Sequence, residues 1–344
     1  MRMIPERAPA TTAVSLDAFH DVWPRAFPIE ELRRLLGEHA DALVAEVLAR
    51  QVNAPVWTLV ERGGKRWRTT IGRLAYRVAG GAAPEPEPVF EVPELLHNAS
   101  LVVDDIEDAA TERRGGPPAH LTYGVPIALN AANAAYFRAL AVLRAHLDDM
   151  RRLRALDMLG EELFAAHLGQ ALDLTLGAYV KLGAELRTSH YELLARAKTG
   201  ALVRIAARLG AIAAGATPQV EDALATWAGE LGVAYQIRDD VEDLALGSSD
   251  LERGRITYPL LALLEDGSRS ARDAVLELLD GGDAGRVARL TALLEDGALS
   301  RRCLAAAREA GDRAAAALAT LPSGPSRDAL HALTAQLAGA GDAA

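Results

Sequence analysis

Residues 191–214 read YELLARAKTGALVRIAARLGAIAA, a stretch rich in Ala and Leu and weakly punctuated. The segments Glu161–Leu176 and Val220–Leu246 have the same character, and Ile29–Leu36 places apolar residues at intervals of three and four. These patterns are typical of helices, and no alternating strand pattern accompanies them. The chain is therefore expected to be all-α, a single-domain bundle of about ten or more helices with its site in a central cavity between facing helices.

The prolines and glycines suggest where this bundle begins and ends. Residues 1–27 contain several prolines and are expected to form a flexible N-terminal arm, followed by a helical domain over residues 28–322. Within that domain, residues 80–88 read GGAAPEPEP and are expected to connect two helices. The Ser/Gly/Pro-rich and Gly/Ala-rich residues 323–344 are expected to fray.

Composition narrows the function classes. The 344 residues carry a net charge of −10, which argues against nucleic acid as a partner because phosphate backbones attract clustered Lys and Arg. The sequence has no run of about 18 apolar residues, so no membrane span is expected. No apolar segment follows Met1–Ala10, so no secretory signal is expected. The single cysteine, Cys303, excludes an internal disulfide and favours a reducing, cytoplasmic location. Its Ala- and Leu-rich surroundings favour a small core residue over a nucleophile.

The first chemistry-bearing motif is the aspartate-rich run 104–108, DDIED, which directly follows the apolar residues Leu101–Val103. On a helix, Asp104 and Asp108 share a face, and two neighbouring carboxylates repel each other unless a cation lies between them. Mg²⁺ is a suitable cation because it accepts one or two carboxylates and completes its shell with water and phosphate. For a single motif, a solvated acidic patch is an equally good interpretation.

A second motif favours the metal. Residues 239–243 read DDVED, again at the end of a helical apolar segment, and two such runs are improbable by chance in this composition. Two aspartate-rich helices can hold a metal cluster around one diphosphate. The candidate ligands are Asp104, Asp105, Asp108, Asp239, Asp240 and Asp243.

Basic motifs accompany the aspartates. The run 63–68, GGKRWR, offers Gly64 for close backbone approach and Lys65 and Arg68 as phosphate partners. Lysine occurs only three times in the chain, so a lysine in a polar motif calls for a reason. Arg113 and Arg114 follow the first aspartate motif and add two guanidinium groups. Each of these, taken alone, could be a solvated basic loop, and Gly200 after Lys198-Thr199 could merely mark a helix kink.

In this order, the motifs resemble the trans-polyprenyl diphosphate synthases, most closely the geranylgeranyl diphosphate synthase branch. The run 95–108, LLHNASLVVDDIED, is similar to that branch almost residue for residue. The resemblance extends over residues 55–265 and includes Arg113-Arg114-Gly115, His120, Tyr123-Gly124, Asn130–Asn133, Gly169–Asp173, Lys198-Thr199 and Tyr235–Asp240.

The resemblance implies a fold of the isoprenoid synthase type with two neighbouring substrate pockets. Isopentenyl diphosphate would be bound by Gly64, Lys65, Arg68, His97 and Arg114. The allylic diphosphate would be bound by Arg113, Lys198 and Arg255 and by a cluster of about three Mg²⁺ ions on the aspartates. Lys198, Thr199 and Gln236 would act at the reacting allylic carbon. The resemblance also suggests a homodimer.

The implied reaction joins the two substrates head to tail. The allylic C–O bond breaks to a carbocation and pyrophosphate, so Mg²⁺ and arginine must neutralise charge on the leaving group in a site that excludes water. The small residues Ala99 and Ser100 lie about one turn before Asp104 and leave room for a growing tail. We expect a twenty-carbon product, unless Tyr136 faces away from that tail.

The sequence departs from the family in one place and admits three rival functions. Only residues 244–249 separate the second aspartate motif from 250–255, DLERGR, where the family carries a longer loop and lysine in place of Arg255. A terpene cyclase also ionises an allylic diphosphate, but it has no use for Lys65 and Arg68. The shortened segment would suit a prenyltransferase with a different acceptor. A non-catalytic partner subunit is the third rival, although both aspartate motifs are intact.

Overall fold

The computed structural model describes residues 16–246, 255–266, 268–279 and 297–339, together with residues 285, 290 and 292. In this part of the chain the regular structure is helical, with one isolated β-bridge between Arg113 and Gly116, which confirms the expected all-α fold. None of the described helices combines the length and apolar composition that a bilayer crossing requires. The chain divides into two compact units, which are described separately.

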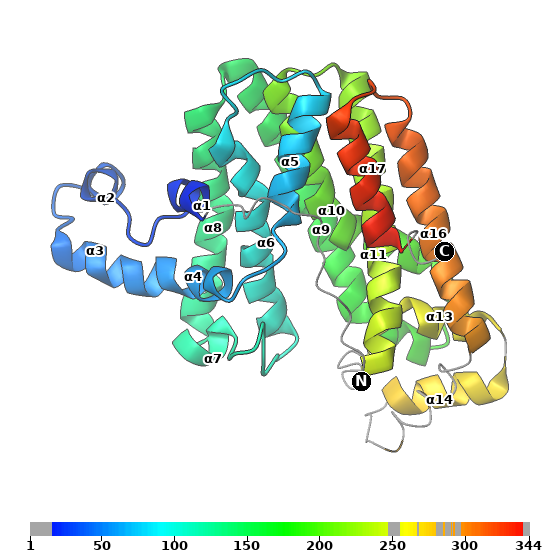
Figure 1. Ribbon diagram of the computed structural model, residues 1–344. Coiled ribbons are helices and arrows are strands. Elements are labelled where there is room, and N and C mark those ends of the chain that lie inside the picture. Colours follow the sequence, from blue (N-terminus) through cyan, green and yellow to red (C-terminus); the bar gives the residue numbers. More distant parts are fainter. Residues whose placement is uncertain are drawn as a thin grey trace. The chain divides into compact units, whose positions relative to one another are not determined.

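The first unit comprises Met1–Thr70 and Pro86–His146. Its two long helices, α6 (Glu87–Glu107) and α8 (Val125–His146), lie side by side in Figure 1. The shorter elements of this unit are α1 (Asp17–Val22), α2 (Ile29–Leu36), α3 (Ala42–Leu48), the π-helical turn η1 (Ala49–Asn53), α4 (Ala54–Glu61), α7 (Ala119–Tyr123) and the start of α5 (Trp67–Val78).

Helix α6 carries the first aspartate motif at its C-terminal end. It starts at Glu87, within the predicted connector, because Pro88 is favourable in a first helical turn, where its missing N–H leaves no bond unmade. The helix ends with Asp108 as its C-cap residue. Five alanines of the neighbouring helix α8 are fully buried, and their small side chains allow close packing: Ala128, Ala131, Ala132, Ala135 and Ala139.

The prediction of a flexible arm is wrong for residues 17–27. Phe19 and Trp23 are 1% and 0% exposed, and Phe19 packs edge-to-face on Trp57 with 5.3 Å between ring centroids. Trp23 Nε1 donates to the carbonyl oxygen of Asn53, and the Asn53 amide donates to that of Pro24. Burial of two aromatic side chains outweighs the helix-breaking effect of the prolines around them.

The second unit comprises Ile71–Glu85 and Leu147–Ala344. It contains the predicted long helices as α9 (Asp149–Lys181), α10 (Thr188–Ala214) and α11 (Pro218–Leu246). Helix α10 packs against both α9 and α11, so the three lie next to one another in Figure 1. The remaining helices are α13 (Tyr258–Glu265), α14 (Arg269–Leu279), α16 (Gly297–Leu318) and α17 (Pro325–Ala338).

Glycines set the spacing of these helices. A Cβ on Gly232 of α11 would lie 2.5 Å from Cα of Gly200 on α10, and a Cβ on Gly169 of α9 would lie 2.5 Å from the backbone nitrogen of Lys198. Gly200 therefore permits a close helix crossing and does not mark a kink, since α10 runs without interruption from Thr188 to Ala214. The crossing brings the predicted residues of α10 and α11 into direct contact.

The prediction of a frayed C-terminal tail is also wrong for residues 325–338. Helix α17 buries Leu330 completely, and Trp227 Nε1 donates to Thr334 Oγ1 at 2.9 Å. These contacts anchor α17 on α11. Cys303 is fully buried on α16, and burial raises the pKa of its thiol to about 11, as expected for a core residue.

Gly232→Ala should lower the free energy of unfolding by about 1–3 kcal/mol, because the new Cβ meets backbone that cannot move aside. Gly160→Ala is the matched control, since no atom lies within 4 Å of a Cβ at that exposed position of α9. The control should be neutral or stabilising by up to about 1 kcal/mol through helix propensity. Urea denaturation of both variants measures the difference, and equal stabilities would contradict the close-crossing interpretation.

Candidate active site

The first aspartate motif lies at the end of α6 and is paired with Arg113. Arg113 Nε donates to Asp105 Oδ1 at 2.7 Å, and its Nη2 lies 3.3 Å from Asp104 Oδ2. Asp104 is half-buried, whereas Asp105 is fully buried, and burial raises the pKa of Asp105 despite Arg113 beside it. The aspartates at 104 and 108 remain half-buried at the surface of this unit. The structure thus separates Asp105, which faces the protein, from the two outer aspartates.

These residues fit Mg²⁺ better than a metal held by protein ligands alone. Among the described residues, no three His, Cys, Asp or Glu side chains converge into a metal-binding group. Oδ2 of Asp105 is buried and has no hydrogen-bond partner in the described part of the chain. Mg²⁺ keeps several water or phosphate ligands and needs only one or two carboxylates, so an incomplete oxygen-only set suits it.

A group of basic side chains surrounds His97 of α6 in the same unit. The pKa of His97 is far below its ordinary value because the ring is buried and because Arg68, Arg114 and Arg113 are close enough to repel a proton. His97 is therefore neutral near pH 7. Three arginines predicted to bind the two substrates are thus brought together around the imidazole of His97.

The remaining predicted residues of this group lie on the loop before α5. Lys65 is exposed there, and a Cβ on Gly64 would come within 3.3 Å of Arg114 Nη2. Gly64 has φ of +145°, a backbone conformation that few other residues adopt. Glycine at this position therefore allows the loop backbone to lie directly against the Arg114 guanidinium.

Two buried acids of α6 support this basic group, and the sequence reasoning missed both. Glu91 accepts from Arg66 Nη2 at 2.5 Å and from Thr69 Oγ1 at 3.3 Å. Glu94 accepts from the backbone N–H of Arg68 at 3.1 Å. The only signal for Glu91 in the sequence was an acidic residue within the apolar run 89–92, VFEV.

In the second unit the predicted residues form an ion pair between α9 and α10 and a separate hydrogen-bonded chain between α10 and α11. Lys198 Nζ binds Asp173 Oδ2 at 2.6 Å, and Thr199 Oγ1 donates to Gln236 Oε1 at 2.6 Å. The Gln236 amide in turn donates to Asp240 Oδ1 at 3.0 Å. This chain fixes the orientation of the Thr199 and Gln236 side chains.

The second aspartate motif also has an inner and an outer part. Asp240 is 5% exposed, and its Oδ2 accepts from the backbone N–H of Tyr258 at the start of α13. Each of its two oxygens thus accepts a hydrogen bond from a protein group, and the role of Asp240 as a metal ligand stays a prediction. Asp239 is half-buried and Asp243 is exposed. Partial desolvation by the surrounding chain and then the charge of Glu242 raise the pKa of Asp243.

Two predicted features of this region are only partly visible. Arg255 is half-buried just before α13. The shortened segment 244–249 and the residues up to 254 lie outside the described residues, apart from the backbone of the last turn of α11.

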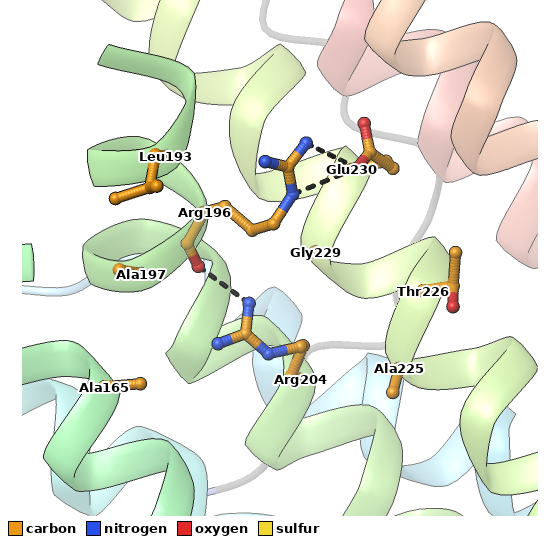
Figure 2. Close-up of a pocket in the computed structure, with 9 residues that line it drawn as sticks. All are labelled: Ala165, Leu193, Arg196, Ala197, Arg204, Ala225, Thr226, Gly229 and Glu230. Atoms are coloured by element: carbon orange, nitrogen blue, oxygen red, sulfur yellow. Dashed lines mark hydrogen bonds and ion pairs between the residues drawn. The ribbon is translucent and has the colours of Figure 1, made fainter. Parts of the chain in front are cut away.

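A separate cavity of about 570 Å³ opens between α9, α10 and α11 (Figure 2). It is lined by alanines and Gly229, and Arg196 pairs with Glu230 along its wall, with Nη2 of Arg196 2.6 Å from Oε1 of Glu230. Arg204 donates to the Arg196 carbonyl oxygen and to Glu162. None of the predicted site residues lines this cavity, and its charged groups are already paired, so it is not the active site.

Comparison with known proteins decides what these residues belong to. Residues 49–296 match the model of the polyprenyl synthetase family. The chain belongs to the polyprenyl synthetase family. It is 31% identical over 245 residues to a short chain isoprenyl diphosphate synthase of Methanothermobacter thermautotrophicus, covering 69% of this chain and 74% of that protein.

A geranylgeranyl diphosphate synthase of Mycobacterium tuberculosis is 30% identical over 284 residues, which is 78% of each chain. The fold matches that of a geranylgeranyl pyrophosphate synthase from Corynebacterium glutamicum, solved with isoprenyl diphosphate and magnesium. That match has a TM-score of 0.77 at 22% identity and covers 94% of this chain and 99% of the other. This polyprenyl synthetase is therefore an enzyme that elongates prenyl chains by prenyl transfer, and members of its family use isopentenyl and allylic diphosphates with Mg²⁺.

The buried Glu91 predicts a pH dependence of stability. Burial raises its pKa to about 7, although Arg66 acts in the opposite direction, and the unfolded chain has a pKa near 4.5. Between these values the folded state binds the extra proton, so stability falls as pH rises. From pH 5 to pH 8 the free energy of unfolding should fall by on the order of 3 kcal/mol more in the native sequence than in Glu91→Gln. Urea denaturation at both pH values measures this, and exposed Glu46→Gln should show no such change; parallel behaviour of Glu91→Gln would contradict it.

Proposed function

We propose that this enzyme condenses isopentenyl diphosphate with an allylic diphosphate and that geranylgeranyl diphosphate is its main product. The observation that carries the proposal is a group of three arginines, Arg68, Arg113 and Arg114, around His97. His97 lies on α6, the helix that ends in the first aspartate motif. A diphosphate needs several such donors to be desolvated. The names of the relatives support a twenty-carbon product.

Isopentenyl diphosphate is bound by the basic group of the first unit. Lys65, Arg68 and Arg114 offer charged donors, and the loop at Gly64 lets backbone approach the phosphate. Neutral His97 adds one N–H donor without a further charge. These residues hold the substrate with its double bond free to attack.

The allylic diphosphate is bound through the aspartates and through Arg113, Lys198 and Arg255. When bound, a cluster of about three Mg²⁺ ions supplies positive charge to the departing pyrophosphate. Asp104, Asp108, Asp239 and Asp243 are the less buried aspartates of the two motifs, and we assign Asp105 and Asp240 to orienting their neighbours.

The remaining residues act on the reacting carbon. Ionisation breaks the allylic C–O bond, and the double bond of isopentenyl diphosphate forms the new C–C bond. The proton lost from the product leaves with pyrophosphate, so no strongly basic side chain is needed. Gln236 and Thr199, held in one orientation by Asp240, direct oxygen atoms toward the cation.

The active enzyme is a homodimer. Val125, Leu129, Phe137 and Leu140 are exposed on α8, and Phe137 is 72% exposed. Their spacing places them on one face of the helix, which a second copy of the chain would cover. Sedimentation equilibrium tests this, and a monomer at micromolar concentration would contradict it.

The enzyme is located in the cytoplasm. The single cysteine of the chain, buried Cys303, is compatible with that location.

Activity should require a divalent metal and the outer aspartates. Asp104→Asn and Asp239→Asn should each lower turnover by at least ~10², because each removes a carboxylate that fixes charge in the transition state. Glu112→Gln, at an exposed acid of the same segment, is the control and should retain activity. Purified protein is assayed with Mg²⁺, isopentenyl diphosphate and a labelled allylic diphosphate, with products identified by mass. Full turnover in excess EDTA would refute the proposal, and so would a cyclised hydrocarbon or the product of a different acceptor.

Product length should depend on Ser100. Its hydroxyl donates to the His97 carbonyl oxygen and its side chain is half-buried, whereas Ala99 is fully buried and cannot line the tail's path. Ser100→Phe should therefore shorten the main product by blocking that path. Ser100→Ala is the matched control and should leave the length unchanged. Chromatography of dephosphorylated products measures both, and an unchanged distribution in Ser100→Phe would show that the tail takes another route.

A further inference from the structure

A tight turn presents the two motif arginines. Arg113 N–H donates to the Gly116 carbonyl oxygen at 2.8 Å, and Gly116 N–H donates back to Arg113 at 3.3 Å. Between them, Arg114 and Gly115 have φ of +52° and +72°, the combination of a type I′ turn. Glycine adopts this conformation freely, but arginine does so only when surrounding contacts hold it there.

Arg62 supplies contacts of this kind from the other basic loop. It lies directly after α4, and its Nη1 donates to the carbonyl oxygens of Pro117 at 2.8 Å and Arg113 at 3.2 Å. The guanidinium also lies flat against the turn, because a Cβ on Gly116 would come 2.7 Å from Arg62 Cζ. Arg62 thus binds the backbone on both sides of the turn.

Arg114 reaches in the opposite direction. Its Nη1 donates to the Leu59 carbonyl oxygen of α4 at 2.8 Å and to Asn98 Oδ1 of α6 at 3.1 Å. Arg62, at the end of α4, therefore binds backbone of the turn, and Arg114, in the turn, binds backbone of α4. Together they join the end of α4 to the turn. The Arg114 guanidinium then lies against Gly64, at the start of the loop that carries Lys65.

We infer that Arg62 is a positioning residue for the isopentenyl diphosphate pocket, through its hydrogen bonds to the Arg113–Gly116 turn. Without them, only the contacts of Arg114 with Leu59 and Asn98 oppose relaxation of the turn from its left-handed conformation, and the Arg114 guanidinium shifts from its place beside Gly64 and His97. Arg113 is held independently by Asp105, so the allylic side is less affected. This inference rests on the assignment of Arg114 and Lys65 to isopentenyl diphosphate.

The first test is a split between the two Michaelis constants. Arg62→Ala should raise the KM for isopentenyl diphosphate by roughly 5–20-fold and that for the allylic substrate by less than about 2-fold. Arg62→Lys keeps one charged donor and should recover part of the loss. Arg50→Ala, which removes a 72% exposed arginine of the same unit, is the control and should leave both constants unchanged.

The second test removes the same contact from the other side. Gly116→Ala should displace the Arg62 guanidinium without straining the backbone, since Gly116 is not among the positive-φ glycines. It should raise the KM for isopentenyl diphosphate as Arg62→Ala does. In the double variant, the new methyl group has nothing to displace, so the effect should equal that of Arg62→Ala alone.

The outcomes separate this inference from the assignment beneath it. Lys65→Ala is measured in parallel, and an unchanged KM for isopentenyl diphosphate in that variant would refute the assignment of the pocket. A raised KM in Lys65→Ala with none in Arg62→Ala would refute the positioning role alone. Equal rises for both substrates in Arg62→Ala, or additive effects in the double variant, would also overturn it. Thermal denaturation of each variant shows whether a change reflects loss of folding.

Discussion

Burying a carboxylate is unfavourable unless a donor or cation meets it, and helix α6 buries three. Glu91, Glu94 and Asp105 are 0%, 4% and 0% exposed, and each receives a donor from a basic segment outside the helix. Removing one partner of such a pair leaves an uncompensated charge, which is far more costly than the pair itself is stabilising. Pairing with these acids therefore dictates where the basic loop and the turn at Arg113 must lie.

The consequence is that structure and function use different parts of the same basic segments. Arg66 and the backbone of Arg68 are engaged by the acids of α6, while Lys65 stays exposed on the loop. In the turn, Arg113 satisfies Asp105 and Arg114 turns the other way, toward Asn98. Within one basic motif, some residues thus fix the position of the segment by pairing with buried acids, and their neighbours remain available to bind an anion.

In the second unit, helix packing and not ion pairing fixes the positions of Thr199 and Gln236. There, close backbone contact at Gly200 and Gly232 brings Thr199 within 2.6 Å of Gln236. Packing of backbone on backbone leaves little room for adjustment, so the polar chain from Thr199 to Asp240 is held by the helices themselves. A loop-borne basic group can adapt to a substrate, whereas the proposed role of Thr199 and Gln236 beside a short-lived cation requires residues that are already in place.

These contrasts explain what the sequence could and could not predict. The long helices and the motif residues were predictable, because periodicity and residue type carry that information directly. The DDxxD pattern alone did not separate Asp104 from Asp105, although adjacent helical residues point about 100° apart and only one can face outward. Arg62 and Glu91 left almost no signal, since their roles depend on partners 55 and 25 residues away. The prolines before residue 28 predict a loose arm, but the aromatic side chains of Phe19 and Trp23 beside them are buried in the core, which proline positions alone do not indicate.

The same organisation resolves an apparent conflict in charge. A chain with net charge −10 is proposed to bind two diphosphates, each of them an anion. At physiological ionic strength, interactions between exposed charges fade within about 8 Å, so the distant acids contribute little. The pKa of His97 is lowered first by burial and then by the charges of Arg68, Arg114 and Arg113, so three arginines lie close to this imidazole. Positive charge is thus concentrated around His97, in the pocket proposed for isopentenyl diphosphate, in a protein that is acidic as a whole.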